Sequence, residues 1–148
     1  MKKLLLILLC LPFIGFGQKT DVYFEEAADN EIFMVVEQMP EFPCLSFRID
    51  SITVREYCGT DALMRYMWKN VKYPPIAKEY GIAGKVYVSY IVEKDGSVTN
   101  VEVVRGVDKN LDAEAVRIVK SIPKYKPGTQ RGKPVRVQFT IPINFTLN

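Results

Sequence analysis

The chain has 148 residues, with 20 lysines and arginines against 17 aspartates and glutamates, and it contains no histidine. If Lys2 and Lys3 are removed with an N-terminal segment, 18 basic residues oppose 17 acidic ones, and the net charge is only +1. This balance does not indicate binding to nucleic acid or to an anionic membrane. The absence of histidine excludes His general bases, Ser-His-Asp and Cys-His pairs, and imidazole metal ligands.

The remaining residues do not suggest catalysis either. Carboxylates such as Asp112 and Glu114 are conceivable as an acid and a base. Two residues apart on a helix, however, they would point in different directions. The sequence therefore predicts a protein that is not an enzyme, with no catalytic residue, no cofactor and no metal site.

The N-terminus has the layout of a secretory signal peptide. Lys2 and Lys3 precede an almost wholly apolar run over residues 4–16, and glycines stand at the two positions that a signal peptidase reads. The apolar run is about 13 residues long, whereas a membrane-spanning helix needs about 20. We expect residues 1–17 to be a signal peptide that exports the protein, with a retained inner-membrane anchor as the alternative.

Two cysteines remain after removal of such a signal. Cys10 would leave with it, and Cys44 and Cys58 stay within a lead-in segment, residues 18–59. In an oxidising compartment an even pair predicts a disulfide, which would stabilise the fold by ~3 kcal/mol in a loop-closure model. Two thiolates without other soft ligands would make a poor zinc site.

The first elements expected in chain order are short. Residues 32–36 are apolar and suit a strand, and Pro40 and Pro43 make residues 38–43 an extended connector. Residues 47–54 alternate weakly between the cysteines, so they form either a hairpin or an irregular loop.

Two helices are expected next. Thr60 is a good N-cap for a helix over residues 62–71, whose apolar residues recur at spacings of three and four. Trp68 is expected to be partly buried beside this helix, with a partner contact as the alternative. Residues 76–80 suit a short helix between a proline and Gly81.

A hairpin and a third helix follow. Residues 85–93 alternate between apolar and polar side chains, Asp95-Gly96 supplies the turn, and residues 98–104 return. A helix over residues 111–121 is expected to have Asp108 or Asn110 as its cap. Tyr125 lies between two prolines, and its side chain is expected to be buried in the core.

The last predicted strand alternates strictly over residues 135–147, so one of its faces should be buried. Pro142 places this strand at the edge of a sheet or at a bulge. An exposed edge of this kind can pair with a strand of a partner protein, unless a bulge at Pro142 or the strand at residues 32–36 covers the edge. The element order predicts an α+β two-layer sandwich: about three antiparallel strands with two to three helices on one face.

Several segments resemble one family in their order and spacing. They are residues 73–84, 86–88, 95–96, 111–115, 123–128, 132–135 and 141–145. Residues 60–148 resemble the TonB C-terminal domain, and residues 38–44 with a second cysteine resemble the lead-in of Bacteroidetes-type TonB-like proteins. This resemblance implies a periplasmic domain whose last strand pairs with a short segment of outer-membrane receptors, the TonB box. It also implies that this pairing serves energised nutrient import.

The resemblance also implies where partners bind. The docking edge would consist of Arg136, Val137, Gln138, Phe139, Thr140 and Ile141, with Tyr73 and Pro74 as a further contact region. Residues 18–59 contain only two prolines, so a stiff spacer of a complete transducer is not evident. Inner-membrane motor proteins and a second copy are further candidate partners. The alternative function is an envelope scaffold or dimerisation module without a role in energy transduction.

Overall fold

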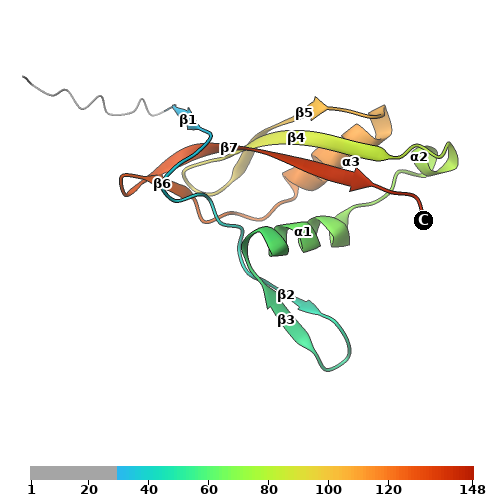
Figure 1. Cartoon of the computed structure of the whole chain (residues 1–148), viewed down its shortest axis with the longest axis horizontal. Helices are drawn as coiled ribbons and strands as arrows, with labels where there is room; N and C mark the ends of the chain where they lie inside the picture. Colours follow the sequence, from blue (N-terminus) through green and yellow to red (C-terminus); the bar gives the residue numbers. More distant parts are fainter. Residues whose placement is uncertain (1–29) are drawn as a thin grey trace, which may run out of the picture.

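The computed structural model describes residues 30–148; the predicted signal peptide, residues 1–17, lies outside the described residues. The main sheet has the strand order β1-β7-β4-β5, with β6 also paired to β7, and the helices pack against one of its faces (Figure 1). The elements are β1 Ile32–Phe33, β2 Leu45–Arg48, β3 Val54–Tyr57, α1 Gly59–Asn70, α2 Pro75–Glu79, β4 Gly84–Val92, β5 Val98–Arg105, α3 Lys109–Lys120, β6 Gly128–Gln130 and β7 Lys133–Phe145.

The antiparallel core of the sheet confirms the predicted fold class. β4 pairs with β5 as a hairpin and with β7 over an unbroken register from Gly84↔Phe145 to Val92↔Val137. β1 and β6 are additions to this three-stranded core. β1 is shorter than the strand predicted over residues 32–36, and β6 was not predicted from the sequence.

The alternation along β4 and β7 places one apolar face against the helices. Val86, Val88, Tyr90 and Val92 of β4 are at most 1% exposed. They share one core cluster with Leu111, Ala115, Ile118 and Val119 of α3, Leu63 and Met67 of α1, and Ile143 and Phe145 of β7. Burying such side chains contributes about 1.5–3 kcal/mol each, so this two-layer contact dominates the stability of the domain.

The helix starts differ in one case from the prediction. α1 begins at Gly59 with Cys58 as its N-cap, and no side chain caps it, so Thr60 was wrong as the cap. The amide of Gly59 donates to the carbonyl of Phe42 at 3.2 Å, which fixes the chain before Thr60. For α3 the structure selects Asp108, whose carboxylate accepts from the amide of Asn110 at 2.9 Å.

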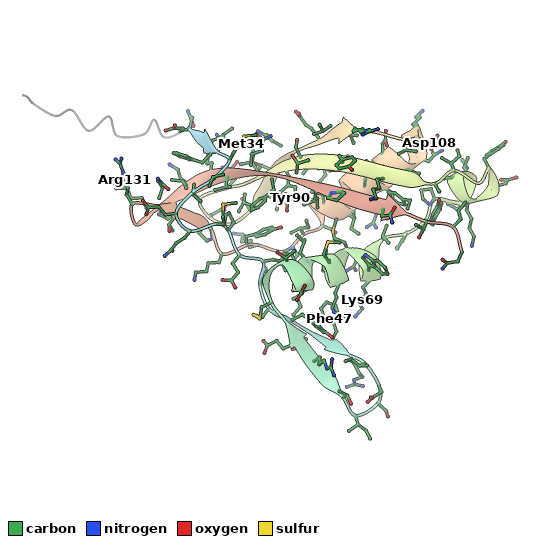
Figure 2. The ribbon with its side chains drawn as sticks, in the orientation of Figure 1. Met34, Phe47, Lys69, Tyr90, Asp108 and Arg131 are labelled. Atoms are coloured by element: carbon green, nitrogen blue, oxygen red, sulfur yellow. A yellow bond between two sulfur atoms is a disulfide. The ribbon has the colours of Figure 1, made fainter. Side chains whose placement is uncertain are left out.

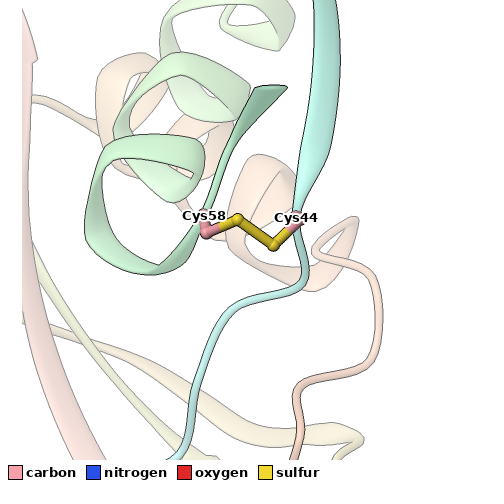
Figure 3. Close-up of a disulfide and its surroundings, with 2 residues drawn as sticks. All are labelled: Cys44 and Cys58. Carbon is pink, nitrogen blue, oxygen red and sulfur yellow. A yellow bond between two sulfur atoms is a disulfide. The ribbon is translucent and has the colours of Figure 1, made fainter. Parts of the chain in front are cut away.

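A disulfide closes a separate hairpin before α1. Cys44 and Cys58 are bonded to each other (Figure 3), and β2 and β3 pair antiparallel between them. The segment between the cysteines is therefore a hairpin and not an irregular loop. Glu56 lies near both sulfurs, but sulfurs joined in a disulfide are not thiolate ligands for a metal.

The turn of the β4–β5 hairpin is packed against the segment that follows α3. The amide of Tyr125 donates to the carbonyl of Gly96 at 2.9 Å, and the hydroxyls of Tyr125 and Tyr90 lie 2.6 Å apart. Burial raises the pKa of Tyr125 to about 12 and also raises that of Tyr90, so both phenols resist ionisation more strongly than a free tyrosine does. Tyr125 is 6% exposed and fills the core as predicted.

Candidate functional site: the free edge of the last strand

The two edges of β7 have different neighbours. Val137 pairs with Val92 of β4 and also with Phe33 of β1, so β4 and β1 lie on opposite edges of the strand. β4 continues along its edge to Phe145, whereas β1 reaches only Arg136 and Val137. Among residues 30–148, no strand pairs with the second edge of β7 beyond Val137. We call the segment from Gln138 to Phe145 the free edge.

Pro142 lies inside this strand without a bulge. It pairs with Tyr87 in the continuous β4–β7 register, and the predicted alternative of a bulge at this position was therefore wrong. Proline has no N–H, so its nitrogen must face away from β4. Because backbone polar groups alternate along a strand, Gln138, Thr140 and Asn144 also direct their N–H groups to the free edge.

The free edge has only one of the features that usually prevent strand pairing. Its sequence, QFTIPINF, carries no charge, and the side chains of Thr140, Pro142 and Asn144 are exposed. Natural edge strands are commonly blunted by lysine or other charges, by bulges or by proline. Only Pro142 serves this purpose here, and the N–H of Thr140 precedes it, whereas the N–H of Gln138 faces Phe33 of β1. The first half of the free edge is thus open to a partner strand.

The beginning of the docking edge predicted from the sequence is occupied by the chain itself. Ile32 and Phe33 of β1 pair in parallel with Arg136 and Val137. Val36 packs with Val135 and Val137 in a small second cluster that Phe33 also contacts. The structure therefore divides the predicted docking residues: Arg136 and Val137 are covered by β1, and Gln138, Phe139, Thr140 and Ile141 lie on the free edge.

The side chain of Arg136 is engaged within the domain. Its Nε and Nη2 atoms donate to the two carboxylate oxygens of Glu93 at 2.8 and 3.0 Å, and its Nη1 donates to the carbonyl of Asn30 at 3.2 Å. The hydrogen bonds from Arg136 hold the pKa of Glu93 below its usual range. A bidentate pair of this kind orients β7 against the end of β4. Sequence reasoning missed it because the two residues are far apart along the chain.

Tyr73 and Pro74 lie at the other end of β7. The ring of Tyr73 packs edge-on against Phe145, with centroids 5.8 Å apart, and its hydroxyl donates to the carbonyl of Ile82. Pro74 is the N-cap of α2. The structure does not bring this pair together with Arg136. It places Tyr73 and Pro74 where they fix the chain between α1 and β4.

These features are accompanied by a direct match to known sequences. The family model of the Gram-negative bacterial TonB protein C-terminal matches residues 69–147. The chain belongs to the TonB C-terminal family. Two curated proteins named Protein TonB, from two strains of Xanthomonas campestris pv. campestris, are 33% identical over 78 residues, 52% of this chain and 34% of each relative. The chain thus spans about a third of the length of these TonB proteins.

Two solved structures are also similar to this TonB-family chain. The NMR solution structure of Helicobacter pylori TonB-CTD, residues 194–285, is 29% identical with a TM-score of 0.45, covering 57% of this chain and 88% of that one. A longer version, residues 179–285, is 23% identical with a TM-score of 0.41, covering 58% and 79%. Within residues 30–148, none of the helices has the length and apolar character needed to cross a membrane.

Proposed function

We propose that this protein is a periplasmic binding module that docks onto TonB-box segments of TonB-dependent outer-membrane receptors by strand addition, in the service of energised nutrient import. The observation that carries the proposal is the uncharged free edge of β7. Membership of the TonB C-terminal family supports it. Main-chain hydrogen bonds to such an edge supply affinity, and pockets for alternate side chains supply selectivity.

The free edge fixes the register in which we expect a partner strand to pair. Thr140 offers an N–H and a carbonyl to the partner, whereas Pro142 offers a carbonyl only. Gln138 offers its carbonyl, because the parallel pairing of Phe33 with Val137 directs the N–H of Gln138 to the carbonyl of Phe33. The strongest pairing is therefore expected over Gln138, Phe139, Thr140 and Ile141. Tyr73 and Pro74 would act indirectly, by holding the end of β7 through Phe145.

A proline substitution tests this docking mode. Thr140→Pro removes an N–H that faces the free edge and leaves the bonds of β7 to β4 and to β1 in place. We expect it to weaken binding of TonB-box peptides from receptors of the same organism by ~10-fold or more, measured by calorimetry. The control is Thr146→Pro, which lies after the end of β7 and should bind like the parent chain.

Two results would count against the proposal. The first is no binding at millimolar peptide by the folded parent chain. The second is an unchanged affinity of the Thr140→Pro variant, which would place the peptide elsewhere.

The same edge also favours a second candidate function. An uncharged, unpaired strand edge can pair with a copy of itself, which would make the protein an envelope scaffold or dimerisation module. In that case the apparent mass in sedimentation would rise with protein concentration, and Thr140→Pro would keep the chain monomeric. A separate measurement, the mass of the mature protein, would show whether residues 1–17 are removed. If they are retained as an inner-membrane anchor, motor proteins of the inner membrane would become candidate partners.

A further inference from the structure

The β2–β3 hairpin is a separate projection from the domain. Its strands pair only with each other among the described residues, and the hairpin points away from the main sheet (Figure 1). The Cys44–Cys58 disulfide closes its base and ties it to the start of α1. The hairpin also lies outside residues 69–147, which match the family. It is therefore an addition to the family domain, and the free edge of β7 is complete without it.

This projection exposes large apolar side chains. Ile52, at the tip of the hairpin, is 90% exposed, and Ile49 and Val54 beside it are also exposed. Trp68 of α1 is 78% exposed, so the expectation that it would be partly buried was wrong. Ile49 and Trp68 line one groove, and exposed apolar side chains that gather on a domain surface commonly mark an interaction site.

An open groove lies between the hairpin and α1, with a volume of about 770 Å³. Phe47 and Tyr57 line it from the two strands, and Met64 and Trp68 line it from the helix. Met64 and Trp68 are four residues apart, so they share an exposed face of α1 next to the face that carries the buried Leu63 and Met67. We call this feature the hairpin–helix groove.

The groove is lined by more positive than negative charge. Arg48, Arg65 and Lys69 contribute cations, and Asp61 is the single carboxylate among its lining residues. Within residues 30–148, none of the three cations forms an ion pair. Their charges are therefore available to a ligand.

Aromatic rings position two of these cations. The guanidinium of Arg65 lies 3.8 Å from the ring centre of Tyr57, and Nζ of Lys69 lies 5.5 Å from that of Phe47. Figure 2 shows Phe47 and Lys69 meeting between the hairpin and α1. Cation–π contacts of this kind restrain long side chains and leave their outer N–H groups free to donate.

We propose that the hairpin–helix groove is a second docking site, which takes an acidic protein segment bearing aromatic or aliphatic side chains. The unpaired cations would bind its carboxylates, and the rings of Phe47, Tyr57 and Trp68 would take its apolar side chains. This site does not depend on the free edge of β7. A chain with both sites could hold a receptor strand at the sheet and a second, acidic partner at the hairpin.

The test is an NMR titration of the purified chain with the capped peptide Asp-Phe-Glu-Leu-Glu-Asp. A second peptide with lysine at each acidic position is the matched ligand. We expect the acidic peptide to shift amides of the hairpin and α1, and to bind ~10-fold more tightly than the lysine peptide. Combined Arg65→Glu and Lys69→Glu substitutions should reverse this preference. The matched control, Lys78→Glu with Lys109→Glu on distant exposed surface, should preserve it.

Trp68→Ala provides a variant that removes no core contact, because this side chain is exposed. It should weaken binding of the acidic peptide ~10-fold, whereas Thr140→Pro should leave binding of that peptide unchanged. The proposal is overturned if the acidic peptide causes no saturable shifts in the hairpin, or if both peptides bind the parent chain equally. Equal binding of polygalacturonate would also overturn it, since the groove would then be a general polyanion site.

Discussion

Replacing Gly96 with alanine is expected to lower the free energy of unfolding by about 3 kcal/mol or more. Gly96 has a φ of +86°, and a Cβ atom there would lie 1.9 Å from the carbonyl oxygen of Tyr125. That oxygen belongs to the backbone, so no side-chain rotation relieves the clash. The turn cannot move away cheaply either, because the amide of Tyr125 donates to the carbonyl of Gly96. Urea unfolding followed by circular dichroism would measure the loss.

Gly132→Ala is the matched control. Gly132 also has a positive φ, +75°, but nothing lies within 4 Å of the position its Cβ would take. Its substitution should lower the free energy of unfolding by about 1–2 kcal/mol, the cost of a left-handed backbone conformation for a residue with a Cβ. If the two variants lose equal free energy of unfolding, the hairpin turn does not pack tightly against Tyr125, and the close contact at Gly96 is contradicted.

Removing β1 is expected to strengthen docking at the edge of β7. A chain that begins at Glu37 lacks Ile32 and Phe33, which occupy the edge at Arg136 and Val137. A tethered strand competes at high effective concentration, so its loss should raise the affinity for TonB-box peptides by ~10-fold. The amides perturbed by the peptide should also extend from Thr140 back to Gln138 and Arg136.

The comparison variant keeps β1 but changes exposed side chains next to it. Met34 and Val35 are 71% and 81% exposed, so Met34→Ser with Val35→Ser should bind like the parent chain. If the shortened chain and the parent bind equally and perturb the same amides, β1 does not compete with the partner.

The sequence predicts best the elements whose side-chain period reports burial directly. Alternation along β4 and β7 identified Val86, Val88 and Phe145 as buried, and the structure confirms them. Pro142 indicated an edge strand because proline cannot donate within a ladder. These inferences depend on local chemistry that holds wherever the strand is placed.

The sequence could not predict features that depend on distant partners. β6 has no apolar alternation and forms through a tight turn in which Gly132 has positive φ. Arg136 was assigned to a partner, but Glu93 binds it across 43 residues of chain. The exposure of Trp68 depends on where the disulfide-closed hairpin lies, which no pattern in α1 reveals. The occupation of the docking edge by β1 is likewise a tertiary contact, although the sequence suggested it as one alternative.

Residue-specific amide hydrogen exchange on β7, with and without a saturating TonB-box peptide, tests the central claim most directly. In the free protein, the amides of Phe139 and Ile141 should exchange slowly because they bond to β4, and that of Thr140 should exchange fast. Strand addition predicts that Thr140 becomes slow in the complex while Phe139 and Ile141 stay slow. If Thr140 remains fast with the peptide bound, the partner does not pair with the free edge, and the proposed docking function is contradicted.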